Sequence, residues 1–156
     1  MDVRLIWVGK TKNSSIRTLL QDYVTRIRHL ISCEIIEIRD STRRMSKDGD
    51  KVLAAEGADI QSRLGRDSRV VALDERGTEF ASTQLARWLQ EEQNTGRKEI
   101  VFVIGGPGGL SPTVFERAHL RLSLGKMTWP HELCRVLLLE QLYRALSILH
   151  NIPYHK

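Results

Sequence analysis

The sequence contains only two cysteines and no long apolar run. Cys33 and Cys134 are isolated, with neither a second cysteine nor a histidine at metal-ligand spacing, so both are interpreted as buried packing residues. No apolar stretch is long enough to span a bilayer, and no charged segment followed by an apolar one opens the chain. These absences argue against a metal site and a membrane protein, and they predict a cytosolic protein.

The length and charge of the chain are those of a small basic globular protein. Its 156 residues are most simply one domain, residues 1–156, which is large enough to bury a full core. The 24 Lys and Arg residues exceed the 19 Asp and Glu residues, which gives a net charge of +5. That excess favours a polyanionic partner, although many small basic proteins bind no nucleic acid.

Strand-like and helix-like segments alternate along the whole chain. Strands are predicted at 3–8, 34–38, 69–73, 100–104 and 120–124, and helices from Asn13 or Ser14 to His29 and at 52–64, 82–93 and 130–150. Ser82 or Thr83 is the expected cap of the third of these helices. Strands that alternate with helices imply right-handed crossovers and an α/β fold with a mainly parallel sheet. A binding site is then expected at the carboxyl ends of the strands.

The strand at 100–104 runs into the glycine loop Gly105-Gly106-Pro107-Gly108-Gly109. The loop is not a dinucleotide-binding turn, because the sixth position counted from Gly106 is Ser111 rather than glycine. It is not a phosphate-binding P-loop either, since no Lys-Ser or Lys-Thr follows at the required spacing. Two readings remain, a tight turn between strand and helix, or a backbone that approaches a ligand closely.

A second glycine-bearing loop favours the ligand-binding reading. Gly125 and Lys126 directly follow a predicted strand, and Pro130 is expected in the first turn of the next helix. Backbone groups of the two loops could recognise an adenine edge. Apolar walls would come from Leu73, Ile104, Leu122, Leu124 and Met127. Such a pocket suits a neutral or cationic adenosyl ligand better than a triphosphate.

The terminal helix is apolar around most of its circumference, so it is expected to be buried on most sides, against the sheet and against a second copy of the chain. Its polar positions share one face, namely Glu140, Arg144, Ser147 and Asn151. Arg144 is open to two readings, an ion pair with Glu140 or a cation directed at phosphate or at a base. His131, in the first turn, is expected to be a structural donor rather than a base.

Two polar segments lie outside this helix. The tail residues Tyr154 and His155 are either exposed surface or a cover over an active site, and composition favours exposed surface. The polar segment 41–51 reads as a mobile loop that leads into a helix. Its candidate phosphate contacts are Arg43, Arg44, Lys47 and Lys51, although a solvated loop is the commoner role for any one of them.

Several spaced strings carry a resemblance to a known family. They are Leu5-Ile6-Trp7-Val8-Gly9-Lys10, Phe102-Val103-Ile104-Gly105-Gly106, Leu122-Ser123-Leu124, Met127-Thr128-Trp129-Pro130-His131, Arg135-Val136-Leu137, Glu140-Gln141-Leu142-Tyr143-Arg144-Ala145 and Pro153-Tyr154-His155. Together they resemble the ribosomal large-subunit methyltransferase H family of the SPOUT superfamily. The resemblance implies a homodimer with a deep C-terminal trefoil knot. It also implies methylation, by S-adenosyl-L-methionine and without a metal, of N3 of a pseudouridine in 23S rRNA on the assembled ribosome.

The resemblance also assigns site residues. Cofactor contacts would come from Leu73, Gly105, Leu124, Gly125, Lys126, Met127, Thr128 and Trp129. Gly125 and Trp129 stand where other residues are common in the family. Near the target base, His155 is expected to accept the N3 proton, Arg144 to stabilise the anion and Tyr154 to stack on or close over the base.

Two rival functions are compatible with the same fold. A ribosome-binding factor that keeps the fold without the cofactor is disfavoured by the two glycine loops and the complete tail. A nucleotide-sensing regulator is disfavoured because the P-loop and dinucleotide fingerprints are missing.

Overall fold

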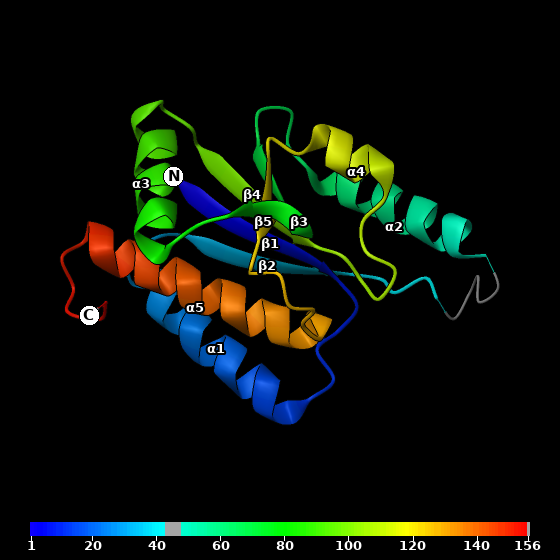
Figure 1. Cartoon of the computed structure of the whole chain (residues 1–156), viewed down its shortest axis with the longest axis horizontal. Helices are drawn as coiled ribbons and strands as arrows, with labels where there is room; N and C mark the ends of the chain where they lie inside the picture. Colours follow the sequence, from blue (N-terminus) through cyan, green and yellow to red (C-terminus); the bar gives the residue numbers. More distant parts are fainter. Residues whose placement is uncertain (43–47, 156) are drawn as a thin grey trace.

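A computed structural model of the chain describes residues 1–42 and 48–155. Five strands form one parallel sheet in the order β2-β1-β4-β3-β5 (Figure 1). The strands are β1 Asp2–Val8, β2 Cys33–Ile38, β3 Arg69–Glu79, β4 Glu99–Ile104 and β5 Leu120–Ser123. The helices are α1 Ser14–Arg28, α2 Gly49–Arg63, α3 Ser82–Asn94, α4 Pro112–Arg117 and α5 His131–Leu149. The predicted parallel α/β architecture is confirmed.

Helices cover both faces of the sheet, with α1, α3 and α5 on one face and α2 and α4 on the other (Figure 1). Along β4, Phe102 faces the first layer, whereas Val101 and Val103 face the second, because successive side chains of a strand alternate. All three are fully buried. Burial on both faces explains why these strands read as continuous apolar runs rather than as alternating ones.

The third strand is longer than predicted. The polar sequence from Asp74 to Gly77 reads as a turn, but β3 continues through it to Glu79. The pairing with β5 breaks after Leu73 and resumes at Thr78, so the four residues form an irregularity inside the strand. Gly77 is required there, because a Cβ at this position would lie 2.6 Å from the carbonyl oxygen of Arg121.

Helix starts depend on residues outside the apolar pattern. Asn13 caps α1 as expected, its side chain accepting a hydrogen bond from the Ile16 N–H at 3.1 Å. Helix α2 begins at Gly49 rather than at residue 52, because Asp48 caps it. Helix α3 is capped by Ala81, and Ser82, an expected cap, is instead its first residue.

The basic segment 41–51 is described only in part. Arg43, Arg44 and Lys47 lie outside the described residues, whereas the exposed Lys51 pairs with Asp48 at 3.8 Å. The trefoil knot stays a prediction. Within residues 1–42 and 48–155, no helix has both the length and the apolar character needed to cross a membrane.

Candidate active site

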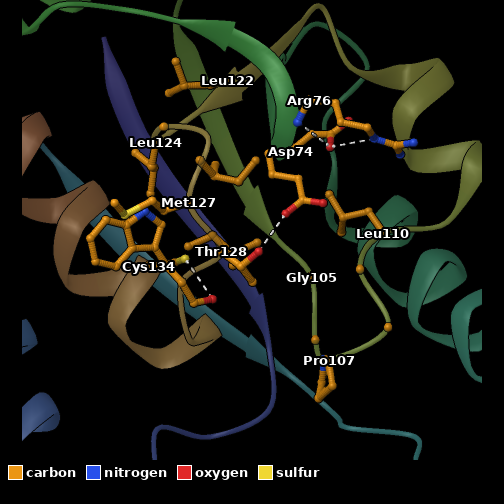
Figure 2. Close-up of a pocket in the computed structure, with 18 of the residues that line it drawn as sticks. Asp74, Arg76, Gly105, Pro107, Leu110, Leu122, Leu124, Met127, Thr128 and Cys134 are labelled. Atoms are coloured by element: carbon orange, nitrogen blue, oxygen red, sulfur yellow. Dashed lines mark hydrogen bonds and ion pairs between the residues drawn. The ribbon is translucent and has the colours of Figure 1, made fainter.

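A cavity of about 500 Å³ opens at the carboxyl ends of β3, β4 and β5, the size of a small-molecule site (Figure 2). Three segments build its walls, the irregular part of β3, the first glycine loop and the loop between β5 and α5. The lining residues are Leu73 to Arg76, Ile104 to Leu110, Phe115, Leu122, Leu124, Gly125, Met127 to Trp129 and Cys134. Both glycine loops therefore belong to one pocket.

The first glycine loop folds against itself. Gly109 donates its N–H to the Gly106 carbonyl at 2.9 Å, and the two residues form an isolated bridge. A Cβ at Gly105 would collide with the backbone carbonyl of Gly109. Gly105 is therefore needed to close the loop, and through the closed loop it shapes the pocket wall.

Ser123 connects the second loop to β3. Its hydroxyl lies 3.1 Å from the Glu75 carbonyl and 3.0 Å from the Gly125 carbonyl, and it accepts a hydrogen bond from the Gly125 N–H. Gly125 has a φ of +118°, which L side chains rarely adopt, and no atom lies near the position of its absent Cβ. On the same wall, the Thr128 hydroxyl donates to the Glu75 carboxylate at 3.3 Å (Figure 2).

The walls combine apolar side chains with acidic ones. The apolar lining residues include Leu73, Leu122 and Leu124, and the acidic ones are Asp74 and Glu75. The Asp74 side chain is only 7% exposed and pairs with Arg76 at 3.6 Å and with Arg121 at 4.0 Å. Arg76 also lines the pocket, so the charge of Asp74 is offset by its two arginine partners, and Glu75 is the lining carboxylate that has no ion pair with a described residue. An unpaired carboxylate attracts a cationic ligand. The apolar side chains and this carboxylate together fit an adenosyl sulfonium.

A second group of polar residues surrounds Glu140 on α5. One oxygen of this carboxylate accepts hydrogen bonds from Arg144 Nε at 3.0 Å, from Arg144 Nη2 at 2.5 Å and from the Tyr154 hydroxyl at 3.1 Å. The Arg144 guanidinium also lies 4.8 Å from the centroid of the Tyr154 ring, and the Tyr143 ring meets that ring edge-on at 4.7 Å. The tail is thus anchored to the helix rather than frayed.

Burial, together with neighbouring Tyr23 and Glu140, raises the pKa of the Tyr154 phenol, so this side chain is a neutral hydrogen-bond donor at physiological pH. The hydrogen bonds that Arg144 donates to the Glu140 carboxylate raise the pKa of Arg144, which stays charged. His155 is exposed.

Comparison with known proteins identifies the family. The family described as "Predicted SPOUT methyltransferase" matches residues 1–155. The chain is 42% identical over 156 residues to "Ribosomal RNA large subunit methyltransferase H" of Burkholderia thailandensis, covering 100% of this chain and 99% of the relative. It is 39% identical to the protein of the same name from Christiangramia forsetii, with 99% of each chain covered. The chain belongs to this SPOUT methyltransferase family.

A solved structure supports the fold of this SPOUT methyltransferase. A probable methylase family protein from Haemophilus influenzae Rd KW20 superposes with a TM-score of 0.53 at 12% identity, over 99% of this chain and 70% of that one. Likeness at this level of identity shows the fold alone.

Most of the expected cofactor contacts of this SPOUT methyltransferase line the pocket. They are Leu73, Gly105, Leu124, Gly125, Met127, Thr128 and Trp129. Lys126 does not line it and is exposed. Asp74, Glu75 and Arg76 were missed, because the sequence signal there reads as a turn.

The expected catalytic residues are brought together only in part. Arg144 and Tyr154 are in contact, but neither they nor His155 line the pocket. At a rise of 1.5 Å per residue, Arg144 lies about 15 Å farther along α5 than Cys134, which does line it.

Three interpretations of single residues were wrong. Cys134 is half-buried and lines the pocket, so it is not a core packing residue, whereas Cys33 is buried as expected. Burial raises the pKa of the Cys33 thiol to about 11 and also raises that of Cys134, so neither is an activated nucleophile. The His131 ring makes no hydrogen bond to any residue that the structure describes, so it is not the structural donor expected. Pro130 is the N-cap of α5 rather than part of its first turn.

Proposed function

We propose that this SPOUT methyltransferase transfers a methyl group from S-adenosyl-L-methionine to N3 of a pseudouridine in 23S rRNA on the assembled ribosome. It would act in the cytoplasm as a homodimer of single-domain subunits spanning residues 1–156. The observation that carries the proposal is the pocket formed by both glycine loops in a chain of this family. The names of the relatives, which specify large-subunit ribosomal RNA, support the substrate class.

The pocket residues would hold the cofactor without a metal. Leu73, Leu122 and Leu124 offer apolar surface to the adenine, and the backbone of Gly125 to Trp129 offers hydrogen-bonding groups. Glu75 places a carboxylate where a sulfonium would be attracted. When bound, S-adenosyl-L-methionine supplies an electrophilic methyl group for in-line displacement, so the protein's task is mainly to position the nucleophile.

Two copies would be needed to complete one site. Among the described residues of one chain, no histidine lines the pocket, and the tail that carries His155 is anchored farther along α5. A symmetric dimer in which the tail of one subunit reaches the pocket of the other would bring the two together. Half-buried apolar residues on α5, such as Leu133 and Leu137, are suited to such an interface.

Deprotonation of N3 is the step for which the tail is proposed. His155 would accept the imide proton. Tyr154, whose phenol O–H is donated to Glu140, would stack on the base or close over it with its ring. Arg144 already donates two hydrogen bonds to Glu140, but its Nη1 has no partner among the described residues. This nitrogen remains available to stabilise the anion that forms.

Mixing two inactive variants tests this arrangement. His155→Ala should lower turnover while leaving cofactor affinity unchanged, and Leu124→Arg should block the pocket. If pocket and tail come from different subunits, a one-to-one mixture should recover about a quarter of wild-type activity, since half of the dimers are mixed and each has one intact site. His150→Ala is the control, because it removes another exposed imidazole close to the tail. A mixture as inactive as its components would contradict the shared site.

A further inference from the structure

A second cavity lies beside the cofactor pocket, at the carboxyl ends of β1 and β2. Its volume is about 570 Å³, and Pro107 belongs to the walls of both cavities. The other walls come from the segment after β1, the end of β2 and the first turn of α5. Its polar lining residues are Lys10, Lys12, Glu37, Arg39, Asp40, His131 and Glu132. An occupant of this cavity would therefore adjoin the methyl donor.

Arg135 holds the segment after β1, which forms one wall of the second cavity. Arg135 is fully buried, and it donates from Nη2 to the Val8 carbonyl and from Nη1 to the Thr11 hydroxyl, both at 2.7 Å. Its guanidinium lies 4.9 Å from the ring centroid of Trp7. The segment that presents Lys10 and Lys12 is therefore held in place before any ligand binds.

Backbone hydrogen bonds to Glu132 and to the end of β2 also hold the segment after β1. The Glu132 carboxylate accepts hydrogen bonds from the backbone N–H groups of Lys12 at 2.6 Å and of Asn13 at 3.2 Å. Gly9, with a φ of +81°, donates its N–H to the Ile38 carbonyl at 2.8 Å and so joins the end of β1 to the end of β2. The shape of the cavity is therefore maintained by hydrogen bonds between its walls.

The carboxylates of the cavity accept hydrogen bonds from N–H groups of the protein, whereas its cations have no such partner in the part of the chain that the structure describes. Glu132 is occupied by backbone N–H groups, Glu37 accepts a hydrogen bond from the Trp7 indole at 3.3 Å, and Asp40 accepts one from the Thr42 N–H at 2.9 Å. In contrast, the exposed side chains of three cations form no ion pair or hydrogen bond with any described residue. They are Lys10, Lys12 and Arg39.

The first turn of α5 forms part of the cavity wall, with Pro130 as the N-cap and His131 as the first residue of a helix of 19 residues. Glu132 in that turn already places a carboxylate at the positive end of the helix, so the helix end alone does not call for an anionic ligand. The three unpaired cations of the cavity are the groups that offer donors suited to phosphate oxygens.

We propose that this second cavity binds a backbone phosphate of the RNA substrate, next to the nucleotide that is methylated. The proposal rests on the proposed function, because it takes RNA as the substrate. Lys10, Lys12 and Arg39 hold the phosphate, and Pro107 separates it from the methyl donor. The site positions the strand and reads no base.

The test measures binding of the protein to ribosomes that lack the modification, by co-sedimentation over a range of KCl concentrations without cofactor. The variants are Lys10→Gln, Lys12→Gln and Arg39→Gln. Lys98→Gln is the matched control, because Lys98 is exposed and precedes β4, at the opposite end of the parallel sheet. Loss of one phosphate contact should weaken binding about five- to eightfold at 0.1 M salt and lower the salt slope by roughly 0.7 to 0.9. Cofactor affinity should not change.

The outcomes separate this inference from the proposed function. Wild-type protein that neither binds nor methylates ribosomes would contradict the proposed function itself. Wild-type protein that does both, with the three variants binding as the Lys98→Gln control does, would overturn only the phosphate site. Inorganic phosphate serves as a second probe. If it bound at the cavity while the variants still bound ribosomes normally, the site would be one for free phosphate and the inference would be wrong.

Discussion

Replacing Glu140 by glutamine should release the tail from α5. The neutral side chain keeps the size of the original but loses the charge that attracts Arg144 and Tyr154. Arg144 and Glu140 are 25% and 19% exposed, so their interaction is partly screened by solvent. Exposed pairs spaced by four residues contribute about 0.3–0.5 kcal/mol, and hydrogen bonds to charged groups contribute about 1.5–3 kcal/mol. We therefore expect unfolding free energy to fall by about 1–2 kcal/mol.

For a chain of this length that loss corresponds to a decrease in Tm of roughly 2–8 °C. Hydrogen exchange should show faster exchange at Tyr154 and His155, whereas cofactor affinity should be unchanged because Glu140 does not line the pocket. Turnover should fall, since the proposed base would lose its position. Glu91→Gln on α3 is the control, because the Glu91 side chain is exposed and has no partner among the described residues. Unchanged exchange in the tail combined with lower turnover would refute the anchoring role of Glu140.

Three further predictions concern the pocket and the buried ionisable groups. Gly105→Ala should lower both cofactor affinity by calorimetry and Tm, because the added Cβ collides with the Gly109 carbonyl; wild-type values would contradict the tight loop. Alkylation of Cys134, followed by mass spectrometry, should be slow at neutral pH and should accelerate only above the ordinary thiol pKa, because burial raises the pKa of this thiol. S-adenosyl-L-methionine should block the reaction, and rapid alkylation at neutral pH would contradict the raised pKa. Burial raises the pKa of Glu56, so its contribution to stability is present below the unfolded-state pKa and is lost as pH rises through the folded-state value. Glu56→Gln, which keeps an acceptor for the Ser41 N–H, should therefore raise Tm at pH 7 relative to wild type and lose that advantage near pH 4; an equal difference at both pH values would exclude this linkage.

The strands and helices could be predicted because their signals are local. Continuous apolar runs such as 100–104 indicate strands covered on both faces, and the structure buries Phe102 and its neighbours in that way. The continuation of β3 through Asp74 and Glu75 could not be predicted in this way. Those residues have turn composition, and their strand conformation depends on β5, which lies more than forty residues away in the sequence.

The parts of the site that were missed depend on contacts distant in sequence. Arg135 interrupts an apolar helix and looks like a surface position, yet it is buried against Val8 and Thr11 more than 120 residues earlier. Its burial builds the second cavity, which no motif marks. Ser147 was placed on the polar face with Glu140, but it is fully buried, because helical spacing alone does not show which neighbours cover a face.

The central claim is tested most directly by transfer of labelled methyl from S-adenosyl-L-methionine to ribosomes that lack the modification, with free rRNA and separate subunits in parallel. Label is expected at N3 of one pseudouridine of 23S rRNA, on assembled particles and not on free rRNA or separate subunits. Measurable cofactor binding without transfer to any of these RNAs would contradict the substrate. Absence of both transfer and cofactor binding would contradict the methyltransferase assignment and favour a ribosome-binding factor that has kept only the fold.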